Sequence, residues 1–257
     1  MTLQVLIATM HQTDHSLLDK MNIQSDAIVI NQCDCDKIEK FTYKGHEIIW
    51  LSLNERGIGL SRNTALMRGT ADIVLFADED VIYEDGYSQK IINAFDKNPK
   101  ADILLVDLKA IGNVKHLEKA YTYHQVKWHN SMRYGAVHFA CKRERIFNQG
   151  IFFNLMFGGG AKYSCGEDSI FLADALKKGL KVWSVPGYVG TVTHGESTWF
   201  QGYTDKYFYD KGVLMGTIFG KLAYPLIVAL FIKNREQTKE CGLNKAIKKA
   251  YEGIKKK

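Results

Sequence analysis

Three acidic residues follow directly on an apolar run near the middle of the chain. Residues 73–77 read Ile-Val-Leu-Phe-Ala, and Asp78-Glu79-Asp80 comes next. A short apolar run of this kind predicts a buried strand of a parallel sheet. If the chain stays extended, Asp78 and Asp80 point to one side and Glu79 to the other. Two carboxylates at the end of such a strand suit Mg²⁺ or Mn²⁺. An acidic turn that caps the next helix is the alternative interpretation.

A second pair of acids, Glu167-Asp168, follows Gly166 at the start of a helix expected over residues 167–178. Acids in the first turn of a helix interact favourably with its dipole, and this alone would explain them. The functional alternative is a general base that takes a proton from an acceptor hydroxyl. The glycine-rich loop at 158–160 is expected to be mobile and could close over such a site as a lid. A buried acid beside another acid would also have a raised pKa.

A loop with two glycines precedes a further helix. Residues 56–63 read Arg-Gly-Ile-Gly-Leu-Ser-Arg-Asn, and we expect the helix over 62–68 with Ser61 as its N-cap. The loop lacks the third glycine of a dinucleotide-binding turn and the Gly-Lys-Ser/Thr of a P-loop. It therefore indicates either a plain capping loop or a helix N-terminus that holds an anionic or nucleotide ligand beside Arg62 and Asn63.

Histidine and cysteine residues offer weaker signals. His194 follows a short apolar segment and could complete a metal site begun by the acidic pair, although a lone histidine is usually structural. The chain has five scattered cysteines, which argues against a zinc module or a disulfide framework. A thiol enzyme built on Cys165 and His194 is disfavoured because nothing marks the cysteine as activated. A metal site at Cys33-x-Cys35 is disfavoured further.

Composition and charge limit the classes of protein that fit. Hydrophobic residues make up 46% and charged residues 24% of the 257 positions, as in an ordinary globular protein. A chain of this length can form one domain, or one domain plus an appendage. The net charge of +6 resides entirely in residues 233–257, which hold nine Lys or Arg and three Glu. The remainder is neutral, which argues against a nucleic-acid-binding globule. The cysteine pattern favours a reduced, cytoplasmic setting, and we expect no secretory signal at the N-terminus.

Strands and helices alternate over the first hundred or so residues, which predicts βαβ units around a mostly parallel sheet with flanking helices. Expected strands cover 4–9, 27–30, 46–51, 73–77 and 102–108, and expected helices cover 16–21, 62–68 and 86–97. Tyr87, Ile91 and Phe95 should form the apolar face of the last of these helices. The second half is less regular, with a helix at 119–133, strands at 136–141 and 181–185, and the helix at 167–178.

A long apolar segment, 213–232, lies just before the basic tail. It has about the ~20 residues that a spanning helix requires, but Lys221 and Pro225 interrupt it. An interfacial or hairpin helix is therefore favoured over a span, and a core-packed helix is the alternative. The basic tail would be attracted to an anionic cytoplasmic leaflet.

Several of these motifs, taken together, resemble an inverting family-2 glycosyltransferase of the GT-A fold. The resemblance covers residues 3–200 and rests on six pieces in the family's order and spacing. These are the first strand ending in Thr9, Gly59-Leu60-Ser61-Arg62-Asn63, Asp78-Glu79-Asp80, Phe139-Ala140-Cys141-Lys142-Arg143, Gly166-Glu167-Asp168 and His194.

The resemblance implies a role for each matching residue. On the donor side, Thr9 and Gln32 would contact the nucleobase, and Arg62 and Asn63 would lie near the nucleotide. Asp78 would serve the ribose or the metal shell, while Asp80 and His194 would bind the metal. On the acceptor side, Asp168 would be the base and Glu167 would orient the acceptor. The family usually has an Asp-Asp pair after its second strand, where this chain has Asn31-Gln32. An amide can still hydrogen-bond a uracil edge.

The expected protein is a glycosyltransferase that uses Mn²⁺ or Mg²⁺ and a nucleotide sugar, most simply a UDP-sugar. Its acceptor would be a saccharide, lipid-linked, in surface-polysaccharide synthesis at the inner face of the cell membrane. Residues 1–210 would form the catalytic domain, with a nucleotide-binding half (1–110) and an acceptor-binding half (111–210). Residues 211–257 would attach it to the membrane surface.

Two other functions stay open. One is a sugar-nucleotide pyrophosphorylase, whose glycine-rich loop with an arginine should lie near Thr9, where this chain has Met10-His11-Gln12. The other is a non-catalytic membrane scaffold that keeps the nucleotide-sugar pocket.

Overall fold

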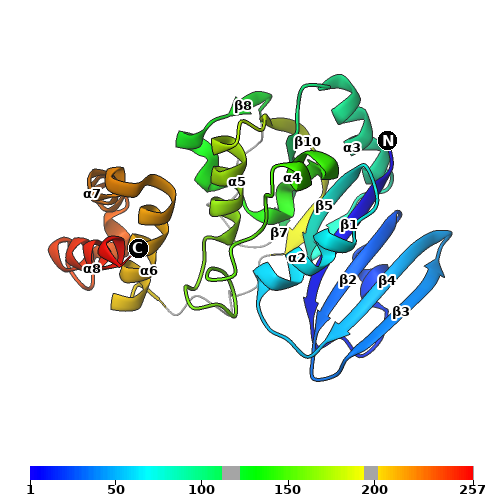
Figure 1. Ribbon diagram of the computed structural model, residues 1–257, viewed down its shortest axis with the longest axis horizontal. Helices are drawn as coiled ribbons and strands as arrows, with labels where there is room; N and C mark the ends of the chain where they lie inside the picture. Colours follow the sequence, from blue (N-terminus) through cyan, green and yellow to red (C-terminus); the bar gives the residue numbers. More distant parts are fainter. Residues whose placement is uncertain (112–121, 194–201, 257) are drawn as a thin grey trace.

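A mixed β-sheet runs through the molecule, with helices on both faces (Figure 1). The computed structural model describes residues 1–111, 122–193 and 202–256. Within these ranges the sheet has ten strands in the order β3-β4-β2-β1-β5-β9-β7-β10-β6, with β8 paired to β10.

The N-terminal part of the chain builds four parallel strands. They are β1 (Leu3–Met10), β2 (Asp26–Gln32), β4 (His46–Leu53) and β5 (Ile73–Asp78). Pairing places Thr9 opposite Asn31, Asn31 opposite Ser52, and Ala8 opposite Asp78. The polar residues that end these strands therefore meet at one edge of the sheet, where ligands of parallel sheets bind. The edge strand β3 (Lys37–Tyr43), antiparallel to β4, is not predicted from the sequence.

The second half of the sheet has parallel and antiparallel pairs. Its strands are β6 (Val81–Tyr83), β7 (Ile103–Ile111), β8 (His124–Val126), β9 (Phe139–Lys142) and β10 (Val182–Thr193). Strand β9 lies antiparallel between β5 and β7. Strand β10 is parallel to β7 and antiparallel to β6, and it continues well beyond the expected strand at 181–185.

Two expected helix positions are wrong. Helix α2 (Ile58–Arg68) begins after Gly57 and not after Ser61, because Gly57 adopts φ +127° and the chain is already helical at Ile58. The helix expected at 119–133 is absent over its described part, 122–133, where β8 and the 3₁₀ helix η1 (Trp128–Arg133) are found. Residues 119–121 lie outside the described ranges.

The other helices of the sheet region are α1 (Leu17–Lys20), α3 (Tyr87–Lys97), α4 (Arg143–Asn148), α5 (Glu167–Lys177) and the short 3₁₀ helix η2 (Ala136–His138). Helix α3 buries Tyr87, Ile91 and Phe95, as its sequence pattern predicts.

Strand β5 separates the two halves of the hydrophobic core. Its alternating side chains Ile73, Leu75 and Ala77 face one cluster, while Val74 and Phe76 face the other, and all five are fully buried. The prediction of a buried central strand is therefore confirmed. This packing fixes the position at which Asp78 leaves the core.

The C-terminal residues form a group of helices at the left of Figure 1. They are α6 (Asp205–Phe219), η3 (Gly220–Leu222), α7 (Ala223–Lys233), η4 (Arg235–Thr238) and α8 (Leu243–Lys255). Helices α6 and α8 cross closely at Gly212 and Gly253. A Cβ on Gly212 would lie 1.9 Å from the carbonyl oxygen of Ala250, so only glycine fits there.

By length and composition, the helical segment Asp205–Lys233 could cross a membrane, with a mean hydropathy of 1.8 and 39% of its most apolar window buried. The backbone breaks it at Gly220, which has φ +57°. The segment therefore consists of two separate helices, α6 and α7, which pack against each other. Helix α6 also packs against α5, in a cluster that includes Leu214 and Ile170.

Candidate active site

A cavity of about 430 Å³ opens beside the C-terminal ends of β1, β2 and β4. Polar and aromatic residues line it, among them His11, Gln12, Cys33, Cys35, Trp50 and Ser52. Its position at the carboxyl edge of the parallel strands is where nucleotides bind in sheets of this kind.

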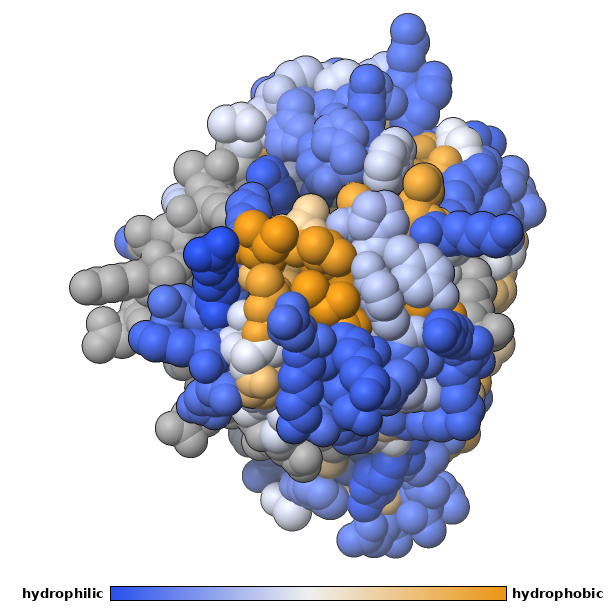
Figure 2. All heavy atoms as spheres, turned by 90° about the vertical axis from the view of Figure 1, so that its left-hand side faces the viewer, coloured by the Kyte–Doolittle hydropathy of each residue, from blue (hydrophilic) through white to orange (hydrophobic). Residues whose placement is uncertain are grey.

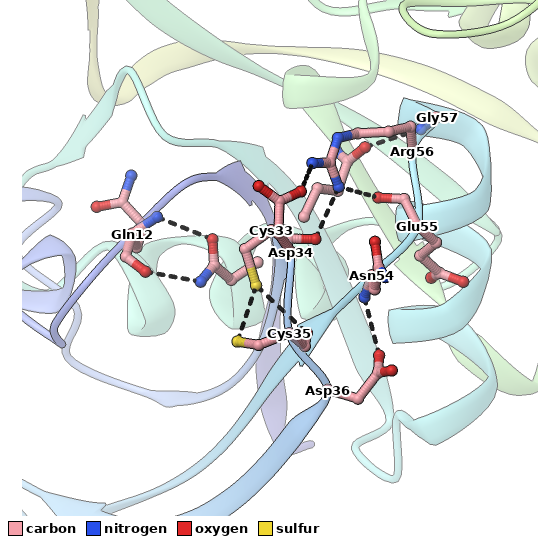
Figure 3. Close-up of polar contacts among 11 residues, drawn as sticks. Gln12, Cys33, Asp34, Cys35, Asp36, Asn54, Glu55, Arg56 and Gly57 are labelled. Atoms are coloured by element: carbon pink, nitrogen blue, oxygen red, sulfur yellow. Dashed lines mark hydrogen bonds and ion pairs between the residues drawn. The ribbon is translucent and has the colours of Figure 1, made fainter.

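The loops beside this cavity are tied together by Arg56 (Figure 3). Its guanidinium donates to the carbonyl oxygen of Cys33 at 2.8 Å and pairs with the carboxylate of Asp34. The thiols of Cys33 and Cys35 lie 3.5 Å apart and both are free. The loop after β2 is therefore fixed to the loop that leads into α2.

Asn31 and Gln32 use their amides to hold neighbouring loops. The Asn31 side chain accepts from the backbone N–H of Gln12 and donates to its carbonyl oxygen, both at 2.9 Å. Gln32 Oε1 accepts from the N–H of Gly57 at 2.8 Å. Gln32 therefore ties the end of β2 to the start of α2.

Glu79 has a position that the sequence pattern does not reveal. Strand β5 ends at Asp78, and residues 79–80 form a turn. The chain is therefore not extended through Asp80, so the condition under which Asp78 and Asp80 point to one side is not met. The turn directs the Glu79 carboxylate to the end of β1, where it accepts from Thr9 Oγ1 and from Gln12 Nε2. Thr9 is 2% exposed, so its hydroxyl is committed to this contact.

Arg62 joins the two acidic motifs. Its Nη2 donates to both carboxylate oxygens of Asp78, at 2.8 and 3.0 Å, and its Nη1 donates to Glu167 Oε1 at 2.8 Å. The guanidinium also lies 5.4 Å from the ring centroid of Phe153. Residues more than a hundred positions apart therefore meet at one buried cation, and the start of α5 is held against the end of β5.

The charges around Arg62 depend strongly on one another. Its side chain is 5% exposed, and that of Glu167 is 11% exposed. Burial alone would lower the pKa of Arg62, but the carboxylates of Asp78 and Glu167 outweigh it and raise that pKa above its usual value. Removing the cation would leave two carboxylates close together with no compensating charge.

Asp168 lies beside this group, in the first turn of α5, and is partly buried. Burial and the adjacent Glu167 carboxylate raise the pKa of Asp168 from 3.8 to about 7, against the opposing effect of Arg62. Its Oδ1 accepts from the N–H of Ser169 at 2.6 Å. A Cβ on Gly135 would lie 3.7 Å from the other oxygen, Oδ2. A carboxylate with a pKa near neutrality suits proton transfer.

The glycine loop contacts both α2 and Glu167. Gly158 has φ +103°, and a Cβ there would lie 2.6 Å from Ile58 and 2.9 Å from the Glu167 carboxylate. The carbonyl oxygen of Gly159 accepts from the N–H of Ile58 at 3.0 Å. Asn63 exchanges two hydrogen bonds with the backbone of Phe153, just before this loop. The loop expected to act as a lid is thus seated on the site in this structure.

The structure also places Asp80 near the end of β10. The carbonyl oxygen of Asp80 accepts from the N–H of Thr193 at 3.2 Å. His194 follows Thr193 directly but lies outside the described residues. Within the described part of the chain, no group of three His, Cys, Asp or Glu side chains is arranged to hold a metal ion.

The predicted site residues therefore form two connected groups. One contains Arg62, Asp78, Glu167 and Asp168. Asn63 belongs to the same group, because it holds the backbone of Phe153, whose ring contacts the Arg62 guanidinium. The other contains Thr9 and Gln32, which are buried near the ends of the neighbouring strands β1 and β2. Sequence reasoning missed three residues that organise these groups: Arg56, Glu79 and Phe153. Glu79 stood inside the recognised acidic motif and Arg56 inside the recognised glycine loop, while no local signal marked Phe153.

Comparison with known proteins adds an independent finding. The profile described as "Glycosyl transferase family 2" matches residues 8–158, more than half of the chain. A search of curated proteins finds no match.

Solved structures of S. aureus TarS share the fold. Residues 1–349 of TarS in complex with UDP-GlcNAc give a TM-score of 0.60 at 16% identity, over 84% of this chain and 66% of that chain. The complex with UDP gives a TM-score of 0.59 at 16% identity, over 84% and 65%. A further TarS structure gives 0.58 at 13% identity, over 94% and 44%. The chain thus spans just under two thirds of the first of these relatives and less of the others.

Proposed function

Because the chain belongs to glycosyl transferase family 2, we propose that it transfers a sugar from a nucleotide sugar to a hydroxyl group of a saccharide, with inversion at the anomeric carbon. A UDP-sugar is the proposed donor. The complexes of S. aureus TarS with UDP-GlcNAc and UDP support that class of donor. Membership of this family argues against the pyrophosphorylase alternative.

The observation that carries this proposal is the double ion pair of Arg62. It connects Asp78, at the edge where a donor would bind, to Glu167, which precedes the proposed base Asp168. The two ion pairs would hold a donor bound at the end of β5 close to the proposed base at the start of α5. Thr9 and Gln32, in the neighbouring strands β1 and β2, are the proposed nucleobase contacts. Gln32 directly precedes Cys33, which lines the 430 Å³ cavity. Arg62 and Asn63 are proposed to lie near the nucleotide.

Asp168 is the proposed general base, and Glu167 is the proposed orienting residue for the acceptor. As the acceptor hydroxyl oxygen attacks the anomeric carbon, the Asp168 carboxylate takes its proton, and the bond from that carbon to the diphosphate breaks. A single displacement of this kind inverts the anomeric configuration. The raised pKa of Asp168 makes it a stronger proton acceptor than an ordinary aspartate, provided that the pH is above about 7.

Asp80, with Asp78 and His194, is the proposed holder of Mn²⁺ or Mg²⁺. Carboxylate and imidazole groups fit such a cation. The backbone of Asp80 is held at the end of β10, where its carbonyl oxygen accepts from the N–H of Thr193. Asp78 shares its carboxylate with Arg62, so Asp80 would be the principal carboxylate ligand. When bound, the cation would offset the charge that develops on the departing nucleotide diphosphate.

We further propose that residues 1–210 form the catalytic domain and that residues 211–257 associate with the inner face of the cell membrane. A lipid-linked saccharide acceptor in surface-polysaccharide synthesis, reached from the cytoplasm, is consistent with such a location. The net charge of +6 over residues 233–257 supports this part of the proposal.

The proposal is tested by screening UDP-sugars for a thermal shift with and without Mn²⁺ and then measuring release of UDP. Asp168→Asn should keep the donor-induced shift and lose turnover. Asp174→Asn is the matched control, since Asp174 is on the same helix and pairs only loosely with Lys177 at 3.8 Å. Full turnover by Asp168→Asn would refute the assigned base. Donor binding by the parent protein without any turnover would instead favour the scaffold.

A further inference from the structure

Helix α7 is apolar on all sides, and only one side is covered. Its inner stripe, Ala223, Ile227 and Phe231, is fully buried against the other C-terminal helices. Its outer stripe consists of Leu222 just before the helix and then Pro225, Ala229 and Ile232, all of which are exposed. Leu222 is 62% exposed and Ile232 is 46% exposed. A soluble helix normally has polar residues on its outer face, so this stripe indicates a partner with an apolar surface.

An apolar groove continues this stripe. It has a volume of about 600 Å³ and lies between α5, η1 and the end of α6. Trp128, Leu176, Ile218 and Phe219 line it, and Leu222 belongs both to the groove and to the stripe. Trp128 is 55% exposed, and its ring centroid lies 5.7 Å from that of Phe219. An exposed tryptophan beside aliphatic residues is typical of the boundary between lipid and water.

Positive charges surround this surface. Lys127, Lys177 and Lys181 line the groove, and all three are exposed. Lys221 and Lys233 stand at the two ends of α7 and are also exposed. Figure 2 shows a hydrophobic patch ringed by hydrophilic residues on the side of the molecule where α6, α7 and α8 lie. An apolar centre within a basic rim complements the acyl region and the headgroups of an anionic leaflet.

We propose that α7 and the groove beside Trp128 form a docking face that lies flat on an anionic phospholipid membrane, with Leu222, Ile232 and Trp128 inserted at headgroup depth. Eleven residues extend about 16 Å, roughly half of the ~30 Å hydrocarbon core, so α7 lies in the interface and does not span it. This inference deepens the membrane association proposed above and does not depend on the transfer reaction.

The test uses the full chain and vesicles of equimolar phosphatidylglycerol and phosphatidylcholine. The double variant Leu222→Glu/Ile232→Glu should bind these vesicles at least about tenfold more weakly, because two apolar contacts are replaced by repelled charges. Ile38→Glu is the matched control. Ile38 is 61% exposed but lies on the edge strand β3, and its substitution should leave vesicle binding unchanged.

Three further measurements make the test specific. Brominated lipids should quench the tryptophan fluorescence of the parent protein, and Trp128→Phe should remove the quenched component. Vesicles of phosphatidylcholine alone should bind weakly, and salt should weaken binding to the anionic vesicles.

Three outcomes would overturn the proposal. The first two are equal vesicle binding by the parent and the double variant, and equal binding of the parent to neutral and anionic vesicles. The third is a parent protein that binds no vesicles but forms a dimer, while the double variant is a monomer. The last would show that the face joins two copies of this chain. Turnover with a soluble acceptor should be the same in the double variant and the parent, so a failure here is distinct from a failure of the proposed reaction.

Discussion

The substitution Asp168→Asn should make the protein more stable at neutral and alkaline pH while it removes the proposed base. The pKa of Asp168 is raised from 3.8 to about 7 in the folded chain, first by burial and then by the charge of Glu167. A group with a raised pKa binds more protons in the folded state than in the unfolded state. Folding stability therefore falls as the pH rises between these two values. Asparagine has no charge to lose and avoids this cost.

The size of the effect follows from the two pKa values. The difference between 3.8 and about 7 corresponds to about 4 kcal/mol. Solvent around the partly exposed side chain reduces this to about 2 kcal/mol. For a chain of this length, about 2 kcal/mol raises the melting temperature by about 4–8 °C. Asparagine Oδ1 can still accept from the N–H of Ser169, so the start of α5 should keep its geometry.

The assay is thermal unfolding of the parent, Asp168→Asn and Asp174→Asn at a series of pH values from 4 to 8.5. The gain of Asp168→Asn should be small near pH 4, grow up to about pH 7 and then level off. Asp174→Asn, on the same helix and with a side chain that is 45% exposed, is the control for the loss of a carboxylate. A melting temperature for Asp168→Asn that falls below the parent's above pH 7, or that differs by the same amount at every pH, would refute the account of the raised pKa.

Three other substitutions test separate parts of the structure. Arg62→Leu should destabilise the folded state by about 3–5 kcal/mol, measured by urea unfolding, because Asp78 and Glu167 would lose their shared cation. A loss of stability below about 1 kcal/mol would contradict the double ion pair of Arg62. Asp80→Ala should abolish the Mn²⁺-dependent part of the donor-induced thermal shift, and an unchanged shift would remove it from the metal ligands. Gly212→Ala should cost about 1–3 kcal/mol, since its Cβ would overlap the backbone at the crossing of α6 and α8; unaltered stability would show that the helices can separate.

The family and the fold class are confirmed as the sequence predicts them, and the physical reasons are local. The run at 73–77 is too apolar to lie anywhere but in the core, and the spacing of Tyr87, Ile91 and Phe95 allows only one buried helix face. Parallel strands bring Thr9, Asn31 and Asp78 to one edge of the sheet. This can be predicted from the strand pattern alone, without information on distant contacts. Short-range patterns were therefore sufficient for the four parallel strands and helix α3, although not for strand β3.

Features that depend on distant contacts could not be predicted. The buried position of Arg62 is set by two carboxylates, Asp78 and Glu167, that lie 16 and 105 positions away in the chain. Strand β9 inserts between β5 and β7 through pairing that no turn signal announces. The start of α2 is moved to Ile58 by its hydrogen bond to Gly159. The apolar pattern at 213–232 also could not show that Gly220 would divide it.

The most direct test of the central claim is a crystal structure of the protein with UDP and Mn²⁺, in which the anomalous signal locates the metal. The account predicts that the metal lies against Asp80 with the diphosphate, and that the Asp168 carboxylate faces the same cleft from the start of α5. A metal bound away from Asp80, or an Asp168 carboxylate directed away from the cleft that holds UDP, would contradict it.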